Sequence, residues 1–124
     1  MVVDTTVFIE FLRAKDRTKT TLANLPPDTK LYVSAVTVFE LFSGATDERK
    51  YSDVNTLLQD LLVLPVNAEV GEKSGEIFRQ LRSSGLMIEA TDILIAATAL
   101  IYEMPVLTLN KRHFEIVQGL VVVE

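Results

Sequence analysis

Short runs of β-branched and apolar residues alternate with longer segments of helical periodicity along the whole chain. This alternation predicts an α/β fold with a mostly parallel sheet of four to five strands, because parallel strands need crossover helices between them. The predicted strands lie at residues 2–3, 31–33, 63–66, 106–109 and 120–123. The predicted helices lie at residues 5–13, 36–42, 47–62, 68–83 and 91–101, with a short helix or turn at 15–25.

The composition predicts one packed domain over residues 1–124, with 48% apolar and 23% charged residues. There are no cysteines, which excludes disulfides, thiolate catalysis and cysteine-based zinc sites. An acid at position 4 is incompatible with the apolar core of a secretory signal, and the apolar runs are too short to span a bilayer. We therefore expect a cytoplasmic protein without a membrane partner.

The net charge of −5 argues against a general nucleic-acid-binding surface, because phosphate contacts usually require a basic protein. Two features would reconcile this charge with binding of nucleic acid. A bound divalent cation would reverse the local sign of an acidic pocket. The positive charge could also be local, and a short basic stretch is present at Arg13, Lys15, Arg17 and Lys19.

Three acids stand just after a predicted strand or at a helix start, where ligands bind in open α/β sheets. Asp4 follows the first strand, although it also suits the N-cap of the next helix. Glu40 follows the second strand, and Thr37-x-x-Glu40 also fits a capping box. Asp92 opens an almost wholly apolar helix, and buried carboxylates are rare unless they are paired or bind a metal. Glu89, three residues earlier, is interpreted as a surface acid or a helper at the rim.

Several neighbouring polar residues are auxiliary candidates. Thr5 and Thr6 could offer hydroxyls to an ion or phosphate, although threonines at a helix start usually bond locally. Asn110 ends the fourth predicted strand, where a polar turn residue is also common. His113 is the sole histidine, more typical of a structural or surface residue than of a base, and one histidine without cysteine does not suit zinc. Oxygen ligands instead favour Mg²⁺ or Mn²⁺.

The joint arrangement of Asp4, Glu40 and Asp92 carries the functional hypothesis. Three carboxylates in one crevice repel one another and raise one another's pKa. A divalent cation would remove that conflict, generate hydroxide from water and neutralise charge on a phosphodiester. The three acids therefore indicate a metal-dependent nuclease.

The chain resembles the PIN-domain family, and within it the VapC-type toxins, over nearly its whole length. The resemblance is strongest at Thr91–Leu100, where Asp92 is followed by the apolar run. The matching stretches are Val2–Ile9, Ser34–Leu41 with Gly44, Thr91–Leu100 and Leu107–Phe114. The family more often has Asn or Ser at the position of Thr6.

This resemblance implies a three-layer α/β/α domain that cleaves RNA with Mg²⁺ or Mn²⁺. It also implies a homodimer and a cognate VapB-like antitoxin that blocks the site. Asp4, Glu40 and Asp92 align with the family's first three acids. The last motif often supplies a fourth acid at the position of Asn110 or of His113, and this chain has neither. We therefore expect one well-held ion, with any second ion needing the phosphate of the substrate.

Two alternatives to the nuclease remain open from the sequence. A receiver-like signalling domain has a similar length and acidity, but it needs an acid pair after the first strand and a phospho-accepting Asp after the third. Here Asp4 has no neighbouring acid and the third strand is followed by Asn67. A PIN-fold protein that has lost cleavage and only binds a partner is the second alternative, and the missing fourth acid and acidic balance favour it.

Overall fold

Five short parallel strands form the central sheet, with the strand order β3-β2-β1-β4-β5. The computed structural model describes all 124 residues. The strands are β1 (Val2–Val3), β2 (Tyr32–Ser34), β3 (Leu62–Leu64), β4 (Val106–Leu107) and β5 (Val122–Val123). From β1 the chain adds β2 and β3 on one side and β4 and β5 on the other, so the strand order reverses at β1. The crevice expected at such a reversal lies beyond the carboxyl ends of β1 and β4.

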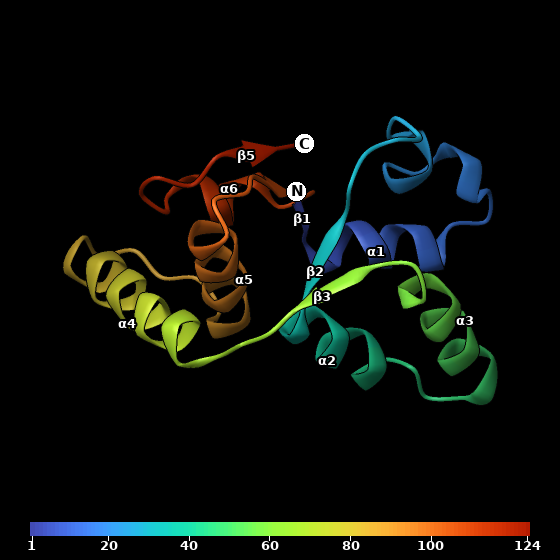
Figure 1. The fold of residues 1–124 in the computed structure, drawn as a ribbon, viewed down its shortest axis with the longest axis horizontal. Helices are drawn as coiled ribbons and strands as arrows, with labels where there is room; N and C mark the ends of the chain where they lie inside the picture. The colour runs from blue at the N-terminus through green and yellow to red at the C-terminus, as the bar shows by residue number, and fades with distance from the viewer.

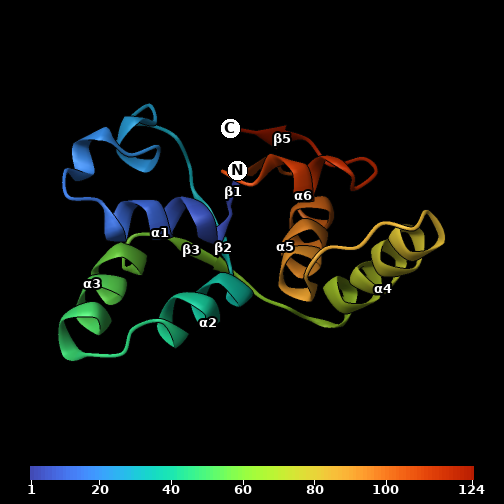
Figure 2. The same ribbon diagram turned by 180° about the vertical axis from the view of Figure 1, so that it is seen from behind.

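Helices cover both faces of the sheet, which confirms the predicted three-layer arrangement (Figure 1, Figure 2). The α-helices are α1 (Thr5–Arg13), α2 (Ala35–Ser43), α3 (Glu48–Leu58), α4 (Ala68–Ser83), α5 (Ala90–Ile101) and α6 (Lys111–Glu115). Two short 3₁₀ helices, Arg17–Lys19 and Leu22–Asn24, follow α1. The longest helix has 16 residues, and no helix has the length and apolarity needed to cross a bilayer.

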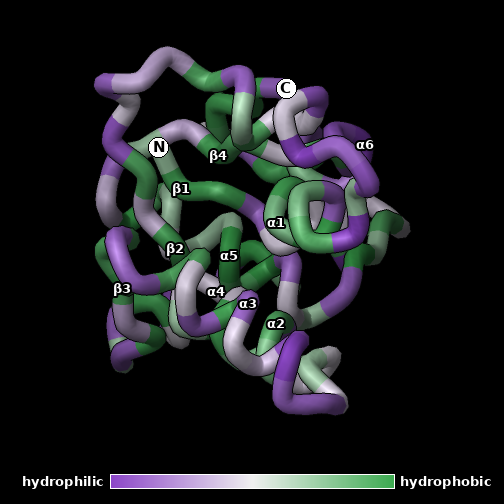
Figure 3. Tube along the Cα trace, turned by 90° about the vertical axis from the view of Figure 1, so that its right-hand side faces the viewer, coloured by the Kyte–Doolittle hydropathy of each residue, from purple (hydrophilic) through white to green (hydrophobic).

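Alternating side chains of the strands divide the core into two clusters. Val2 and Val106 point to the face covered by α4 and α5, whereas Val3 and Leu107 point to the face covered by α1 and α3. This follows from the two-residue period of a strand. Helix α5 is buried along most of its length, as its apolar sequence predicts, and Figure 3 shows the hydrophobic colour following β1 and α5 through the interior.

The observed helix starts revise one interpretation. Helix α2 is capped by Ser34, whose Oγ accepts a hydrogen bond from the backbone N–H of Val36 at 3.1 Å. Thr37 lies inside the helix, so the Thr37–Glu40 capping box does not form. Because the helix begins earlier than the pattern indicated, the side chains of Thr37 and Glu40 are left free for contacts with α1.

Two element boundaries also differ from prediction. The helix expected over residues 47–62 ends at Leu58, because the chain turns to bring Leu62–Leu64 into parallel register with β2. Leu62 is consequently exposed at the sheet edge. Residues 108–110 leave the sheet after Leu107, and a short helix, α6, forms where the sequence indicated only a turn.

Candidate active site

Asp4 lies at the carboxyl end of β1, beside the end of β4. Its backbone N–H donates to the carbonyl of Leu107 at 2.8 Å, so the last ladder bond of the sheet fixes its position. The side chain is almost fully buried, with 2% of the residue exposed. Asp4 has the backbone position of an N-cap but makes no side-chain capping bond. The carboxylate is therefore free for other partners.

Two hydroxyl groups hold one oxygen of the Asp4 carboxylate. Oδ2 accepts hydrogen bonds from Thr6 Oγ1 at 2.7 Å and from Thr108 Oγ1 at 2.8 Å. The other oxygen, Oδ1, takes part in no hydrogen bond, and no unbonded side-chain oxygen is buried, so Oδ1 reaches solvent. The protein thus anchors this carboxylate on one side and leaves its second oxygen available.

Glu40 is held from α1 by a chain of hydroxyls. Thr5 Oγ1 donates to Glu40 Oε1 at 2.8 Å and lies 2.9 Å from Thr37 Oγ1. Since a hydroxyl has one proton and an ionised carboxylate only accepts, Thr37 donates to Thr5 and Thr5 donates to Glu40. Burial raises the pKa of the Glu40 carboxyl above its ordinary value, the Thr5 bond opposes this, and the negative charges of Asp92, Asp4 and Glu89 raise it further.

Asp92 lies in the first turn of α5 and contacts α6. Its Oδ2 is 2.9 Å from Nδ1 of His113. Burial raises the pKa of Asp92, the hydrogen bond from His113 lowers it, and the charge of Asp4 raises it again. The charges of Asp4, Glu40 and Asp92 therefore act on one another across a single region, although the residues are far apart in sequence.

Asn110 and His113 complete this region from the β4–α6 connection. The backbone N–H of Asn110 donates to Thr108 Oγ1 at 2.8 Å, and its Nδ2 lies 2.8 Å from His113 Nδ1. The sequence favours a structural or surface role for His113, but the structure places its ring against Asp92. The short helix α6 produces this contact, and no local pattern predicts that helix.

The three carboxylates share one arrangement. Each has one oxygen held by a protein donor, and the second oxygen forms no hydrogen bond and is not buried. Oxygen donors of this kind suit a hard divalent cation such as Mg²⁺ or Mn²⁺. The site is open, however, and no three of its carboxylate and imidazole groups surround one point closely enough to hold an ion as they lie.

Thr108 and Thr37 belong to this site and are not among the site residues predicted from sequence. Thr108 directly follows β4, and Val3↔Leu107 pairing in parallel register places it next to Asp4. That register is the available signal, because residues that follow paired parallel strands emerge at the same sheet edge. The sequence does not indicate this role for Thr37, because Thr37 and Glu40 fit the pattern of a capping box.

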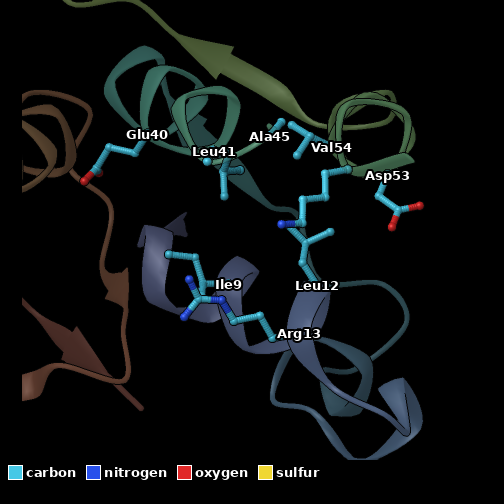
Figure 4. A pocket seen from close by; sticks show the side chains of 10 residues that line it. Ile9, Leu12, Arg13, Glu40, Leu41, Ala45, Asp53 and Val54 are labelled. Carbon is cyan, nitrogen blue, oxygen red and sulfur yellow. The ribbon is translucent and has the colours of Figure 1, made fainter. Parts of the chain in front are cut away.

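A cavity of about 170 Å³ adjoins the site between α1, α2 and α3 (Figure 4). It is lined by Glu40 at one end and by Asp53 and Val54 at the other, with Ile9 and Leu12 of α1 between them. Phe8 is fully buried and belongs to the core, whereas Leu12 lines the cavity.

Comparison with known proteins agrees with the fold. Residues 1–120 match the PIN domain family. The chain is 33% identical to Ribonuclease VapC10 of Mycobacterium tuberculosis, over 97% of this chain and 90% of that protein. It is 29% identical to Ribonuclease VapC1 of Methanocaldococcus jannaschii, over 93% of this chain and 79% of that protein. The structure of DNA-bound VapBC from Salmonella typhimurium superimposes with a TM-score of 0.87 at 26% identity, covering 98% of this chain and 95% of that one.

The fold, the acidic sheet edge and the match over residues 1–120 define the class of protein: the chain belongs to the PIN-domain family. Within that family it is a homologue of the VapC ribonuclease toxins of VapBC toxin–antitoxin systems, at about 30% identity. This assignment removes the receiver-like alternative.

Proposed function

We propose that the protein is a Mg²⁺- or Mn²⁺-dependent endoribonuclease and the toxin of a VapBC-type pair. The proposal rests on one feature that the carboxylates of Asp4, Glu40 and Asp92 have in common. Each carboxylate is oriented through one oxygen by a protein donor and presents its other oxygen without a partner. Burial raises the pKa of Glu40 and of Asp92, neighbouring carboxylates raise both pKa values further, and a cation would relieve that repulsion.

Asp4, Glu40 and Asp92 are the residues that would hold the cation. The cation would supply hydroxide from water and neutralise charge that develops on the phosphodiester. Thr6 and Thr108 keep Asp4 oriented, and Thr5 does the same for Glu40. Asn110, at the β4–α6 connection, offers an amide in place of a fourth acid, so it contributes orientation without negative charge.

The partners follow from the relatives. Structures of VapBC from Salmonella typhimurium and of FitAcB from Neisseria gonorrhoeae, both 26% identical to this chain, support a small antitoxin partner. The substrate is RNA, as the names of the ribonuclease relatives support. We also propose that the chain acts as a homodimer.

The decisive experiment compares RNA cleavage by the native chain, Asp4→Asn and Asp92→Asn in Mg²⁺ or Mn²⁺. Both variants should lose cleavage and keep their fold, because asparagine retains an oxygen that accepts the existing hydrogen bonds while the ligand charge is lost. Glu40→Gln should weaken cleavage severely. Glu115→Gln, which removes an exposed charge from α6, is the matched control. Full cleavage by either Asp variant at the same metal concentration contradicts the assignment.

A non-catalytic PIN protein that only binds its partner is the second candidate function. The absence of an acid at Asn110 and at His113 and the net charge of −5 favour it. Expression of the native chain and of Asp4→Asn separates the two functions. Growth arrest by the native chain alone supports catalysis, whereas two harmless proteins that bind the same partner support the binding function.

A further inference from the structure

A second cleft, of about 560 Å³, lies where the end of α1 approaches the start of α3. Basic side chains dominate its lining. They come from two segments that are separate in the sequence, and they are Arg13, Lys15, Arg17, Arg49 and Lys50. The first segment is the basic stretch after α1, and only the fold joins it to Arg49 and Lys50. The chain as a whole is acidic, with 12 cationic and 17 anionic side chains, so this cleft is a local reversal of sign.

The two acids that line the cleft, Asp47 and Asp53, already interact with other groups of the protein. Asp47 caps α3 by accepting a hydrogen bond from the backbone N–H of Lys50 at 2.8 Å. Asp53 pairs with Arg17 at 3.4 Å, and Arg17 also lies over the ring of Phe11 and bonds to backbone carbonyls of α1. The remaining cations, Arg13, Lys15, Arg49 and Lys50, make no ion pair. Their positive charge is therefore available to a ligand.

The cleft is continuous with the acidic site. The linings of the cavity beside Glu40 and of the basic cleft have four residues in common, Leu12, Arg13, Lys50 and Asp53. In Figure 4 the side chain of Arg13 extends back along α1 toward Ile9, and Glu40 lies at the far end of the same cavity. The nine residues of α1 from Thr5 to Arg13 span about 13 Å at the rise of an α-helix, which corresponds to only a few nucleotides.

We propose that this cleft binds the phosphate backbone of the RNA strand on one side of the bond to be cleaved. The inference rests on the proposed ribonuclease function, because it assigns the polyanion to the substrate of the adjacent site. Uncompensated Arg and Lys side chains are the groups that bind phosphates, and arginine does so through paired N–H donors. The cleft explains how a chain of net charge −5 can bind RNA. Its positive side chains lie together in one cleft that leads to the three acids.

Binding of an uncleavable RNA tests the cleft without requiring catalysis. The probe is a short, fluorescently labelled, 2′-O-methylated single-stranded oligoribonucleotide of mixed sequence, titrated without divalent metal over a range of salt concentrations. The variants are Arg13→Gln/Lys15→Gln and Arg49→Gln/Lys50→Gln. The matched control is Arg79→Gln/Arg82→Gln, which removes two exposed, unpaired charges from α4. Circular dichroism checks that every variant is folded.

Each cleft variant should bind about tenfold more weakly at low salt, and the slope of log affinity against log salt should fall by about 0.7 for each phosphate that the variant no longer binds. The α4 variant should bind like the native chain. Equal losses of affinity in all three variants would overturn the inference, because they would show only an effect of net charge. Unchanged RNA binding by both cleft variants would also overturn it.

Cleavage of the unmodified oligoribonucleotide in Mn²⁺, measured in parallel, separates this inference from the proposed function. If the native chain cleaves RNA and the cleft variants bind RNA unaltered, RNA binding by the cleft is refuted and the proposed ribonuclease activity stands. If RNA binding depends on the cleft but no cleavage occurs, RNA binding by the cleft is supported and the ribonuclease activity is refuted.

Discussion

Nδ1 of His113 lies 2.9 Å from Oδ2 of Asp92, which connects α6 to the first turn of α5 across the candidate active site. Nδ1 also lies 2.8 Å from the side-chain amide of Asn110. A ring nitrogen facing an ionised carboxylate donates its proton, so the hydrogen bond assigns the proton to Nδ1. With its proton on Nδ1, the ring has no lone pair there to accept a hydrogen bond from Nδ2 of Asn110. His113 is thus a positioning residue that fixes the orientation of the Asp92 carboxylate.

Replacing His113 by leucine should lower metal-dependent RNA cleavage by about 10- to 100-fold, the usual effect of removing a group that orients a metal ligand. His113→Asn should retain most of the activity, because its amide N–H can occupy the position of Nδ1. Thermal unfolding of both variants should stay close to that of the native chain, since the side chain of His113 is half-exposed. A leucine variant that cleaves RNA at the native rate contradicts the positioning role.

Thr5→Val should destabilise the protein by about 1–3 kcal/mol, because it leaves the buried hydroxyl of Thr37 without its partner. It should also lower cleavage, since Glu40 loses the donor that holds Oε1. Urea unfolding measures the first effect and a cleavage assay the second. Thr5→Ser keeps the hydroxyl and is the matched control. If Thr5→Val matches the native chain in both measurements, the hydroxyl chain does not orient Glu40.

Glu40→Gln should raise the stability of the metal-free protein at neutral pH. The raised pKa of Glu40 means that the folded state binds its proton more tightly than the unfolded state. The contribution of Glu40 to the free energy of unfolding therefore falls as pH rises from the ordinary pKa of a glutamate through the raised pKa of Glu40. Above that pH the charged carboxylate destabilises the folded state. Glutamine removes that cost and can still accept the bond from Thr5.

Thermal unfolding as a function of pH measures this effect. The advantage of Glu40→Gln should shrink as pH falls through the raised pKa of Glu40 and should be gone below the ordinary pKa of a glutamate, and Glu115→Gln should show no such dependence. Mn²⁺ should raise the melting temperature of the native chain more than that of Glu40→Gln. A Glu40→Gln variant that is less stable than the native chain at neutral pH would refute the destabilising effect assigned to the charged, partly buried Glu40 carboxyl.

Asn110→Asp should increase the affinity of the site for Mn²⁺, because it adds a fourth carboxylate beside Asp92 and His113. Isothermal titration calorimetry measures the affinity, and Asn55→Asp, which adds a charge at an exposed position of α3, is the control. Equal Mn²⁺ affinity in the native chain and Asn110→Asp would show that this position lies outside the metal site.

Much of the layer structure could be predicted from the sequence because its signals are local. The short apolar runs at β1 and β4 and the apolar stretch of α5 indicate the strands and the buried helix directly. Asn67 precedes a helical pattern and is the cap of α4, since its Oδ1 accepts from the N–H of Val70. Asp4 and Asp92 are detectable for the same reason, because Asp4 follows a strand and Asp92 lies in the first turn of a helix, whereas Glu40 lies further along α2.

Contacts between distant segments were decided only by the tertiary structure. The Thr108–Asp4 bond joins residues 104 positions apart, and it depends on the parallel register of β1 and β4. The turn after Leu58 depends on pairing of β3 with β2, which overrides the helical spacing of the leucines. Local sequence determined which residues form strands and helices, because backbone preference and side-chain period act over a few residues. The fold decided which polar groups meet, because those partners are chosen by packing and register across the whole sheet.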